Sequence, residues 1–213
     1  MKMKLFTTTA FNLKSVVMAT ALVFASFGLF SCSSDDDDDD DNDSIAETYN
    51  FESTSTDAEE WVYFSFAEGK EITVDKSKPE ESTAWDIAFQ RFYVRTNSGT
   101  SGKGKGGVLD TGKKNFEEVI SVPASGFTVD EKFQMMTTMG KYEERSGSKA
   151  FKVKDSFSWA WFVYTEMTWY YNNNVFIIRT ADGKNYAKII MKSYKNDADK
   201  SGYITFEYVY PFK

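Results

Sequence analysis

Residues 85–107 read WDIAFQRFYVRTNSGTSGKGKGG, and the two halves of this stretch favour opposite kinds of backbone. Residues 85–96 alternate large and polar side chains, many of them aromatic or β-branched, which predicts a pair of strands half-buried in a sheet. Residues 97–107 hold five glycines among Asn, Ser, Thr and Lys, which predicts a long turn with no packed element. Two interpretations of this loop stay open: a disordered connection, or a mobile flap that closes over a ligand or docks a receptor.

The sequence on either side of this stretch predicts further strands. Residues 157–163 carry large apolar side chains on both faces, which is typical of a central strand. Residues 175–194 are expected to form a hairpin around a glycine-containing turn, and residues 203–210 to close the sheet. Residues 116–120 and 130–136 are the only candidates for a turn or two of helix. The expected class is therefore all-β, a single antiparallel-sheet domain with at most short helical turns. Shorter strands are expected at residues 61–66, 71–74 and 108–112.

The first 50 residues are typical of an exported and anchored protein. Residues 1–31 start with lysines, continue as an apolar run and end beside the only cysteine, which predicts a lipoprotein signal peptide. Cys32 is then the lipidated residue, and the alternative is a secreted protein with a stray thiol. Residues 32–50 form an acidic tether, and residues 51–213 form the β domain. The acidic run also resembles surface-export signals of Bacteroidetes lipoproteins, which implies a lipid anchor on the exposed face of the outer membrane.

Charge and composition exclude several classes of function. The formal net charge of −7 belongs mostly to the tether, so nothing in the β domain favours nucleic acid binding. The chain has no histidine, which removes histidine-dependent nucleophiles and histidine-bound zinc. Adjacent acidic pairs such as Glu143-Glu144 point to opposite faces of a strand, so they do not suit carboxylate catalysis. We therefore expect no enzymatic activity.

The methionines of the expected mature chain are distributed unevenly. Met135, Met136 and Met139 crowd into QMMTTMG, and Met167 stands before an asparagine loop, whereas Met191 lies in a predicted strand. The first interpretation is that all of them fill gaps in an aromatic core. The second is that a thioether from each of the two exposed segments reaches one apolar slot, because thioethers are neutral, soft ligands suited to haem iron or Cu(I). Cations that could meet haem propionates are Arg91, Arg95, Lys103, Lys105 and Arg179.

Three segments carry a family resemblance: residues 85–107, the stretch VFIIRTADGKNYAKIIMKSY at 175–194, and SGYITFEYVYPF at 201–212. Together they resemble the HmuY family, the haem-binding lipoproteins (haemophores) of Bacteroidetes. The resemblance implies an all-β fold that grips haem b between two projecting β regions and delivers it to a TonB-dependent receptor of the outer membrane. The founding member uses two histidines as axial ligands, and this sequence has none, whereas other members use two methionines.

By position, the resemblance places the axial ligands at Met167 and at Met139, with Met136 as the alternate to Met139 and Met135 as a weaker choice. The expected function is haem binding for iron acquisition, and the alternative is a surface binding or adhesion lipoprotein that uses the same scaffold without haem. Residues expected to line the haem pocket are Arg91, Arg95, Trp161, Trp169 and Tyr170.

Overall fold

The computed structural model describes residues 45–213. The predicted signal peptide, Cys32 and the acidic run lie outside the described residues. The end of the segment assigned to the tether is part of strand β1 (Glu47–Glu52), which pairs with the C-terminal strand along its whole length. Phe51 of β1 is buried, so the folded domain begins before residue 51. Among the described residues, no helix is long and apolar enough to span a membrane.

One sheet has five antiparallel strands in the order β1-β13-β12-β11-β6. The hairpin predicted at residues 175–194 is confirmed as β11 (Val175–Arg179) and β12 (Tyr186–Lys195). β13 (Ser201–Val209) lies between β1 and β12 and is therefore not the edge of the sheet. β6 (Gly107–Asp110) forms the other edge beside β11.

The second sheet has four antiparallel strands in the order β3-β2-β4-β5. The strand pair predicted at residues 85–96 is confirmed as β4 (Ile87–Gln90) and β5 (Tyr93–Thr96), and every residue of both strands is buried. β2 (Val62–Ser65) pairs with β4 on one side and with the short β3 (Lys70–Ile72) on the other.

Aromatic rings fill the space between the two sheets. Phe206 of the five-stranded sheet packs against Phe64 and Phe89 of the four-stranded sheet, with ring centroids 5.4 and 5.6 Å apart. Phe51 of β1 packs on Phe89 at 5.1 Å. Ring pairs at these separations stabilise a core by about 0.5–1.5 kcal/mol each beyond their burial. The aromatic alternation in the sequence therefore does form the core of an all-β fold.

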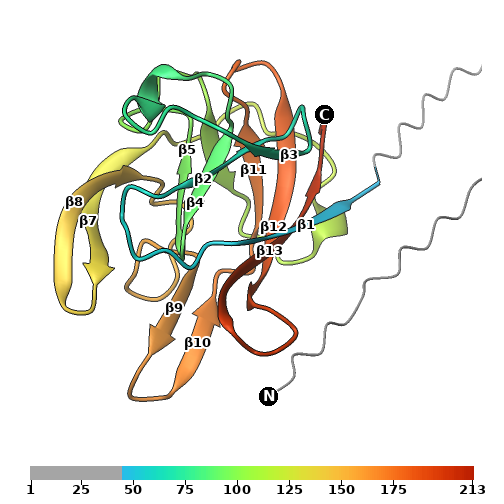
Figure 1. Ribbon diagram of the computed structural model, residues 1–213. Coiled ribbons are helices and arrows are strands. Elements are labelled where there is room, and N and C mark those ends of the chain that lie inside the picture. Colours follow the sequence, from blue (N-terminus) through green and yellow to red (C-terminus); the bar gives the residue numbers. More distant parts are fainter. Residues whose placement is uncertain (1–44) are drawn as a thin grey trace, which may run out of the picture. The chain divides into compact units, whose positions relative to one another are not determined.

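Two hairpins extend from the sheets toward the lower left of the view in Figure 1. The first pairs β7 (Glu131–Thr138) with β8 (Lys141–Gly147), and the second pairs β9 (Ala160–Val163) with β10 (Thr168–Tyr171). The strands of each hairpin pair only with each other. Both hairpins correct the sequence analysis, because residues 130–136 are strand rather than helix and residues 157–163 are not a central strand.

The physical reasons for these two corrections lie in the burial patterns. In β7, Phe133 and Met135 are buried while Lys132 and Gln134 are exposed, which is the two-residue period of a strand. In β9, Trp161, Phe162 and Val163 are only half-buried. Their large side chains therefore do not serve a sheet that is covered on both faces.

Within residues 45–213, the helical content is limited to two single turns of 3₁₀ helix at Pro79–Glu81 and Phe116–Glu118. The second turn confirms the prediction of a short helical turn at residues 116–120. Asn115 caps it, since its side chain accepts a hydrogen bond from the Glu117 amide at 3.1 Å.

The glycine loop at residues 97–107 is packed, contrary to the prediction. Asn97 is fully buried, and its side-chain amide donates to the carbonyls of Ser82 and Trp85 at 2.8 and 2.9 Å. Its Oδ1 accepts from the Gly104 amide at 2.9 Å. A Cβ on Gly102 would lie 2.1 Å from Asn97 Oδ1, so this glycine permits close approach rather than mobility. A run of Gly and Ser therefore wraps one buried asparagine.

The buried carboxyl of Asp130 fixes the start of this loop. It accepts hydrogen bonds from the Thr96 amide at 2.9 Å and the Thr96 hydroxyl at 2.8 Å. The Ser98 hydroxyl in turn accepts a hydrogen bond from the Asp130 amide at 3.1 Å. Burial is the largest influence on this carboxyl and raises its pKa to about 7, although the hydrogen bonds and the charge of Arg95 oppose the change.

This raised pKa predicts that the protein loses stability as the pH rises from 5 to 8. An aspartate in an unfolded chain has a pKa of about 3.9, so between pH ~4 and ~7 the folded protein holds a proton that the unfolded chain has released. Stability from Asp130 is therefore present at low pH and lost as the pH passes the folded pKa. We expect a fall of about 2 kcal/mol in the free energy of unfolding, measured by urea titration.

The chain has no histidine, so few other groups titrate in this interval. Burial also raises the pKa of Asp86, which acts in the same direction. Despite burial, the pKa of Asp182 is lowered to about 2 by its hydrogen bonds, so its titration changes the stability only at more acidic pH. The variant Asp130→Asn should remove most of the dependence of the unfolding free energy on pH. An unchanged dependence would assign the effect to Asp86 instead.

Candidate functional site

The two hairpins border an open cavity of about 420 Å³, a size typical of small-ligand sites. Residues from both hairpins and from the β4–β5 turn form its walls. The lining residues are Arg91, Phe92, Met136, Tyr142, Trp161, Phe162, Val163, Tyr164, Thr165 and Trp169.

Aromatic rings form most of the cavity wall. The Phe92 ring packs edge-on against Trp161 at 5.8 Å, and Trp169 packs against Phe162 at 5.4 Å. Phe162 also contacts Tyr164 near the end of the hairpin, with centroids 5.0 Å apart. Such a surface suits a flat, apolar molecule that can stack on or slide between rings.

Arg91 is the one basic residue of the lining. It occupies the tight turn between β4 and β5 with a φ of +53°, a left-handed conformation that favours glycine. Its amide donates to the Ser53 hydroxyl at 2.8 Å, and its guanidinium lies 4.9 Å from the centre of the Phe92 ring. The site therefore places a single cation at the edge of an aromatic cavity.

The first hairpin is fixed to the scaffold at the level of Met136. The Met136 amide donates a hydrogen bond of 2.8 Å to the hydroxyl of Tyr93, and burial raises the pKa of Tyr93 to about 12. Met136 is half-buried against the core and pairs with Tyr142 across the hairpin, so both side chains belong to the cavity face. This part of the cavity is its floor.

The turns of the two hairpins carry exposed methionines. Met139 follows β7 and is 77% exposed, and Met167 precedes β10 and is 74% exposed. Met167 has a φ of +50°, again a conformation that favours glycine. Among the described residues, half of the eight exposed large hydrophobic side chains lie on these hairpins, which makes the hairpins a candidate binding surface. The four are Met139, Tyr142, Tyr164 and Met167.

Comparison with known proteins identifies the scaffold. The model of the HmuY protein family matches residues 57–208, which is most of the chain. The chain belongs to the HmuY family. A search of curated proteins finds no match.

Solved structures of HmuY-like proteins share the fold. One from Bacteroides vulgatus ATCC 8482, described as HmuY-like and assigned to haem binding, has a TM-score of 0.61 at 24% identity, covering 81% of this chain and 96% of its own. One from Bacteroides fragilis NCTC 9343, described as a lipoprotein, has a TM-score of 0.60 at 24% identity. The match covers 81% of this chain and 93% of that chain. The apo HmuY analogue of Tannerella forsythia has a TM-score of 0.57 at 19% identity. The match covers 77% of this chain and 94% of that chain.

Within this HmuY fold, several of the residues expected from sequence do come together. Arg91, Met136, Trp161 and Trp169 all line the cavity. The expected ligands Met139 and Met167 do not line it, but lie on the turns of the two hairpins that border it.

Other expected pocket residues lie elsewhere. Arg95 is on β5 and lines a different cavity, because its side chain is stacked on the Trp61 ring. Tyr170 bonds to Glu166 and lies under the ammonium of Lys154 at 3.6 Å, outside the cavity lining. The cations Lys103, Lys105 and Arg179 also lie outside the lining, and the Arg179 side chain is bonded to the carbonyls of the glycine loop.

The other two methionines of the described residues are in the core. Met135 and Met191 are 2% and 1% exposed. For Met191 this confirms the sequence interpretation. Met135 sits one residue out of phase with Met136 on β7, so the strand period directs it away from the cavity.

Six lining residues were missed by the sequence analysis. Tyr142 could have been found only from the register of β7 and β8, which pairs it with Met136. The other five would have been found by predicting a hairpin turn at residues 164–167 and by assigning the β4–β5 turn to the cavity. They are Phe92, Phe162, Val163, Tyr164 and Thr165.

Proposed function

We propose that this HmuY-family protein is a haemophore that binds haem b as its cargo between the β7–β8 and β9–β10 hairpins. One observation carries the proposal: an aromatic cavity is bordered by two hairpins that each hold out a methionine with no role in packing. The HmuY-like relative from Bacteroides vulgatus that is assigned to haem binding supports it.

The donor set of the site fits haem. The porphyrin is flat and apolar, which suits walls built from Phe92, Trp161 and Trp169. Thioether ligands are neutral, so they can bind iron in an apolar cavity without burying another charge. Arg91 supplies the cation that a propionate requires at the cavity edge.

Met139 and Met167 are the proposed axial pair. Both side chains are free of packing and stand on the turns of opposite hairpins, so each can turn toward an iron atom at the cavity mouth. Met136 is held against the core and lies deeper, at the cavity floor. It is therefore the alternate ligand, for a haem that binds deeper in the cavity.

The proposal includes a lipid anchor at Cys32 and a location on the exposed face of the outer membrane. The lipoprotein-like N-terminus and the lipoprotein description of the Bacteroides fragilis relative support it. From there the protein would pass haem to a TonB-dependent receptor for iron acquisition. Haem bound beside exposed turns is accessible to such a partner.

The expected signature of two thioether ligands is a preference for reduced haem. Sulfur ligation stabilises the softer ferrous iron and raises the haem potential. We expect ferrous haem to bind at least about tenfold more tightly than ferric haem, which corresponds to a potential about 59 mV higher than that of free haem. Titrations with and without dithionite, followed by the Soret and α/β bands, measure both affinities.

The titration also separates the two candidate functions. A low-spin spectrum that forms on reduction supports haem carriage. Spectra that equal those of free haem in both oxidation states would contradict it and leave the scaffold with another apolar ligand or an adhesive role.

A further inference from the structure

A second cavity of about 310 Å³ opens on a different part of the fold and shares no residue with the first. It lies among the segment before β2, the turn before Trp85, the glycine loop and the base of β8. Its lining residues are Glu59, Trp61, Lys76, Ser77, Pro79, Glu80, Arg95, Thr100, Ser101, Arg145 and Ser146.

Arg95 is the buried cation of this cavity, with only 9% of its surface exposed. Three aromatic rings surround its guanidinium: Trp61 at 4.2 Å, Tyr63 at 5.0 Å and Trp85 at 5.5 Å. Its one hydrogen-bond partner is the Tyr63 hydroxyl, and its Nε is buried without a partner. A guanidinium has five N–H donors, so most of its donors are unused by the described residues.

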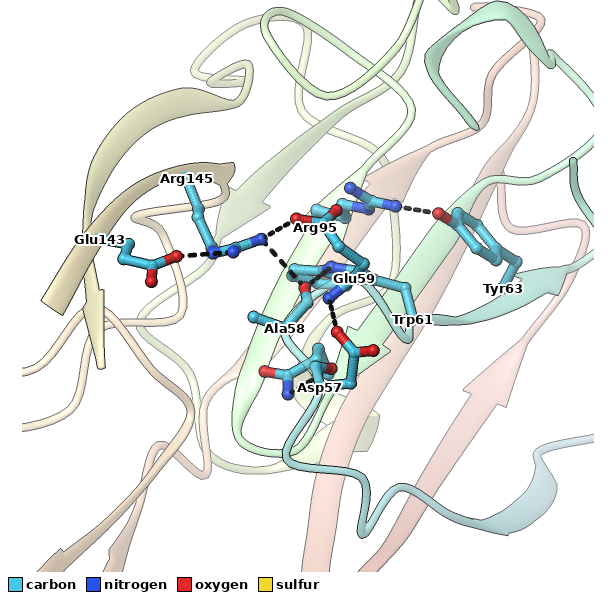
Figure 2. A network of polar contacts seen from close by, with 9 residues as sticks. Asp57, Ala58, Glu59, Trp61, Tyr63, Arg95, Glu143 and Arg145 are labelled. Carbon is cyan, nitrogen blue, oxygen red and sulfur yellow. Dashed lines mark hydrogen bonds and ion pairs between the residues drawn. The ribbon is translucent and has the colours of Figure 1, made fainter. Parts of the chain in front are cut away.

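No carboxylate in the described part of the chain lies within 4.0 Å of this guanidinium. Arg145, in the same cavity, shows the contrast. It forms ion pairs with Glu59 and with Glu143, the latter at 2.7 Å, and also donates to the Ala58 carbonyl. Figure 2 shows these contacts and the single dashed line from Arg95 to Tyr63.

Asp130 supplies only part of the missing charge. Burial raises its pKa to about 7, so near neutral pH this carboxyl is ionised only in part. A buried cation without an ion-pair partner is costly, and burial lowers the pKa of Arg95, although the charges of Asp130 and Glu59 oppose this change. The positive charge at the cavity wall is therefore only partly compensated.

We propose that this cavity binds a small oxyanion, a carboxylate or phosphate group, with Arg95 as its charged anchor. The planar guanidinium, fixed by the rings around it, offers the donor geometry that recognises both groups. Thr100 and Ser101 also line the cavity, and so do two further cations, Lys76 and Arg145, which are already paired with carboxylates. Glu59 and Glu80 line it as well and oppose anion binding, so the occupant has to be compact enough to contact Arg95 without approaching them.

The test uses the haem-free full chain, so its result is independent of the haem proposal. Sodium phosphate and sodium acetate are titrated separately at constant ionic strength against sodium chloride. The readouts are tryptophan fluorescence, because Trp61 and Trp85 contact Arg95, and the thermal unfolding midpoint. The variant is Arg95→Met, which keeps an apolar stem between the rings. The matched control is Lys192→Met, which removes a cation on β12 that lines neither cavity.

We expect a saturable change with phosphate, acetate or both, unaffected by Lys192→Met and at least about tenfold weaker in Arg95→Met. The anion that saturates identifies the class of ligand. A linear, non-saturating change in fluorescence or in the unfolding midpoint that persists in Arg95→Met would reflect general salt effects and overturn the proposal. If Arg95→Met does not fold by circular dichroism, Ser101→Ala tests the same cavity: weaker saturation supports the site, and unchanged saturation overturns it.

Discussion

Replacing Met167 by glycine is expected to lower the affinity for ferrous haem about a hundredfold while leaving the folded protein at least as stable. Met167 is 74% exposed and has a φ of +50°, a conformation that costs a residue with a Cβ and suits glycine. Removing the side chain therefore relieves strain worth about 0.5–1 kcal/mol and loses no packing. The same change removes one proposed iron ligand. Haem titration and urea unfolding of one sample measure both effects.

Asp199→Gly is the matched control for this variant. Asp199 also has a positive φ, +60°, in the exposed turn between β12 and β13, and it is outside the cavity lining. Asp199→Gly also removes an exposed ion pair with Lys195 at 2.8 Å, so we expect a change in stability of about 1 kcal/mol or less and no change in haem affinity. Met139→Ala should reproduce the loss of the low-spin spectrum, and Met136→Ala should not. Unchanged haem binding in Met167→Gly would contradict the ligand assignment whatever its stability.

The distribution of strained residues supports a functional reading of the hairpins. Four non-glycine residues in the described chain have positive φ values, and two of them, Arg91 and Met167, border the aromatic cavity. Each occupies a turn position where glycine would be more stable. Strain that persists at such positions is often associated with function. Here the two strained side chains are the proposed propionate partner and a proposed iron ligand.

Much of the fold follows from local sequence patterns. Alternating aromatic residues predict the β4–β5 pair and the β11–β12 hairpin, because burial on one face imposes a period of two. The prediction of a central strand at residues 157–163 was wrong, because large apolar residues on both faces of a strand can have two causes. They mark a strand buried between layers, or a hairpin whose outer face receives a ligand. The sequence alone does not distinguish them.

For the candidate site, the residue pattern alone left the role of the methionines open, and the family resemblance assigned Met139 and Met167 by position. Both side chains are exposed on hairpin turns, and their role as ligands stays a prediction. Arg95 was assigned to the same pocket because a cation on a strand next to Arg91 looked available. Arg91 lies in the β4–β5 turn with a φ of +53°, so the strand period does not relate the two side chains, and Arg95 packs instead against Trp61 and Tyr63. Which arginine faces which cavity depends on tertiary packing.

The largest loss of stability is expected for Asn97→Ala, at about 3–5 kcal/mol. The substitution removes the hydrogen bonds to the buried carbonyl of Trp85, the partly buried carbonyl of Ser82 and the partly buried amide of Gly104, and an orphaned buried group costs about 1–3 kcal/mol. It also removes the side chain around which the glycine loop is packed. Urea unfolding measures the loss. Asn115→Ala, the same change at an exposed cap with one hydrogen bond, should cost about 1 kcal/mol or less. Equal losses at the two positions would mean that the loop is as loosely held as its composition suggests, and that its hydrogen bonds contribute little.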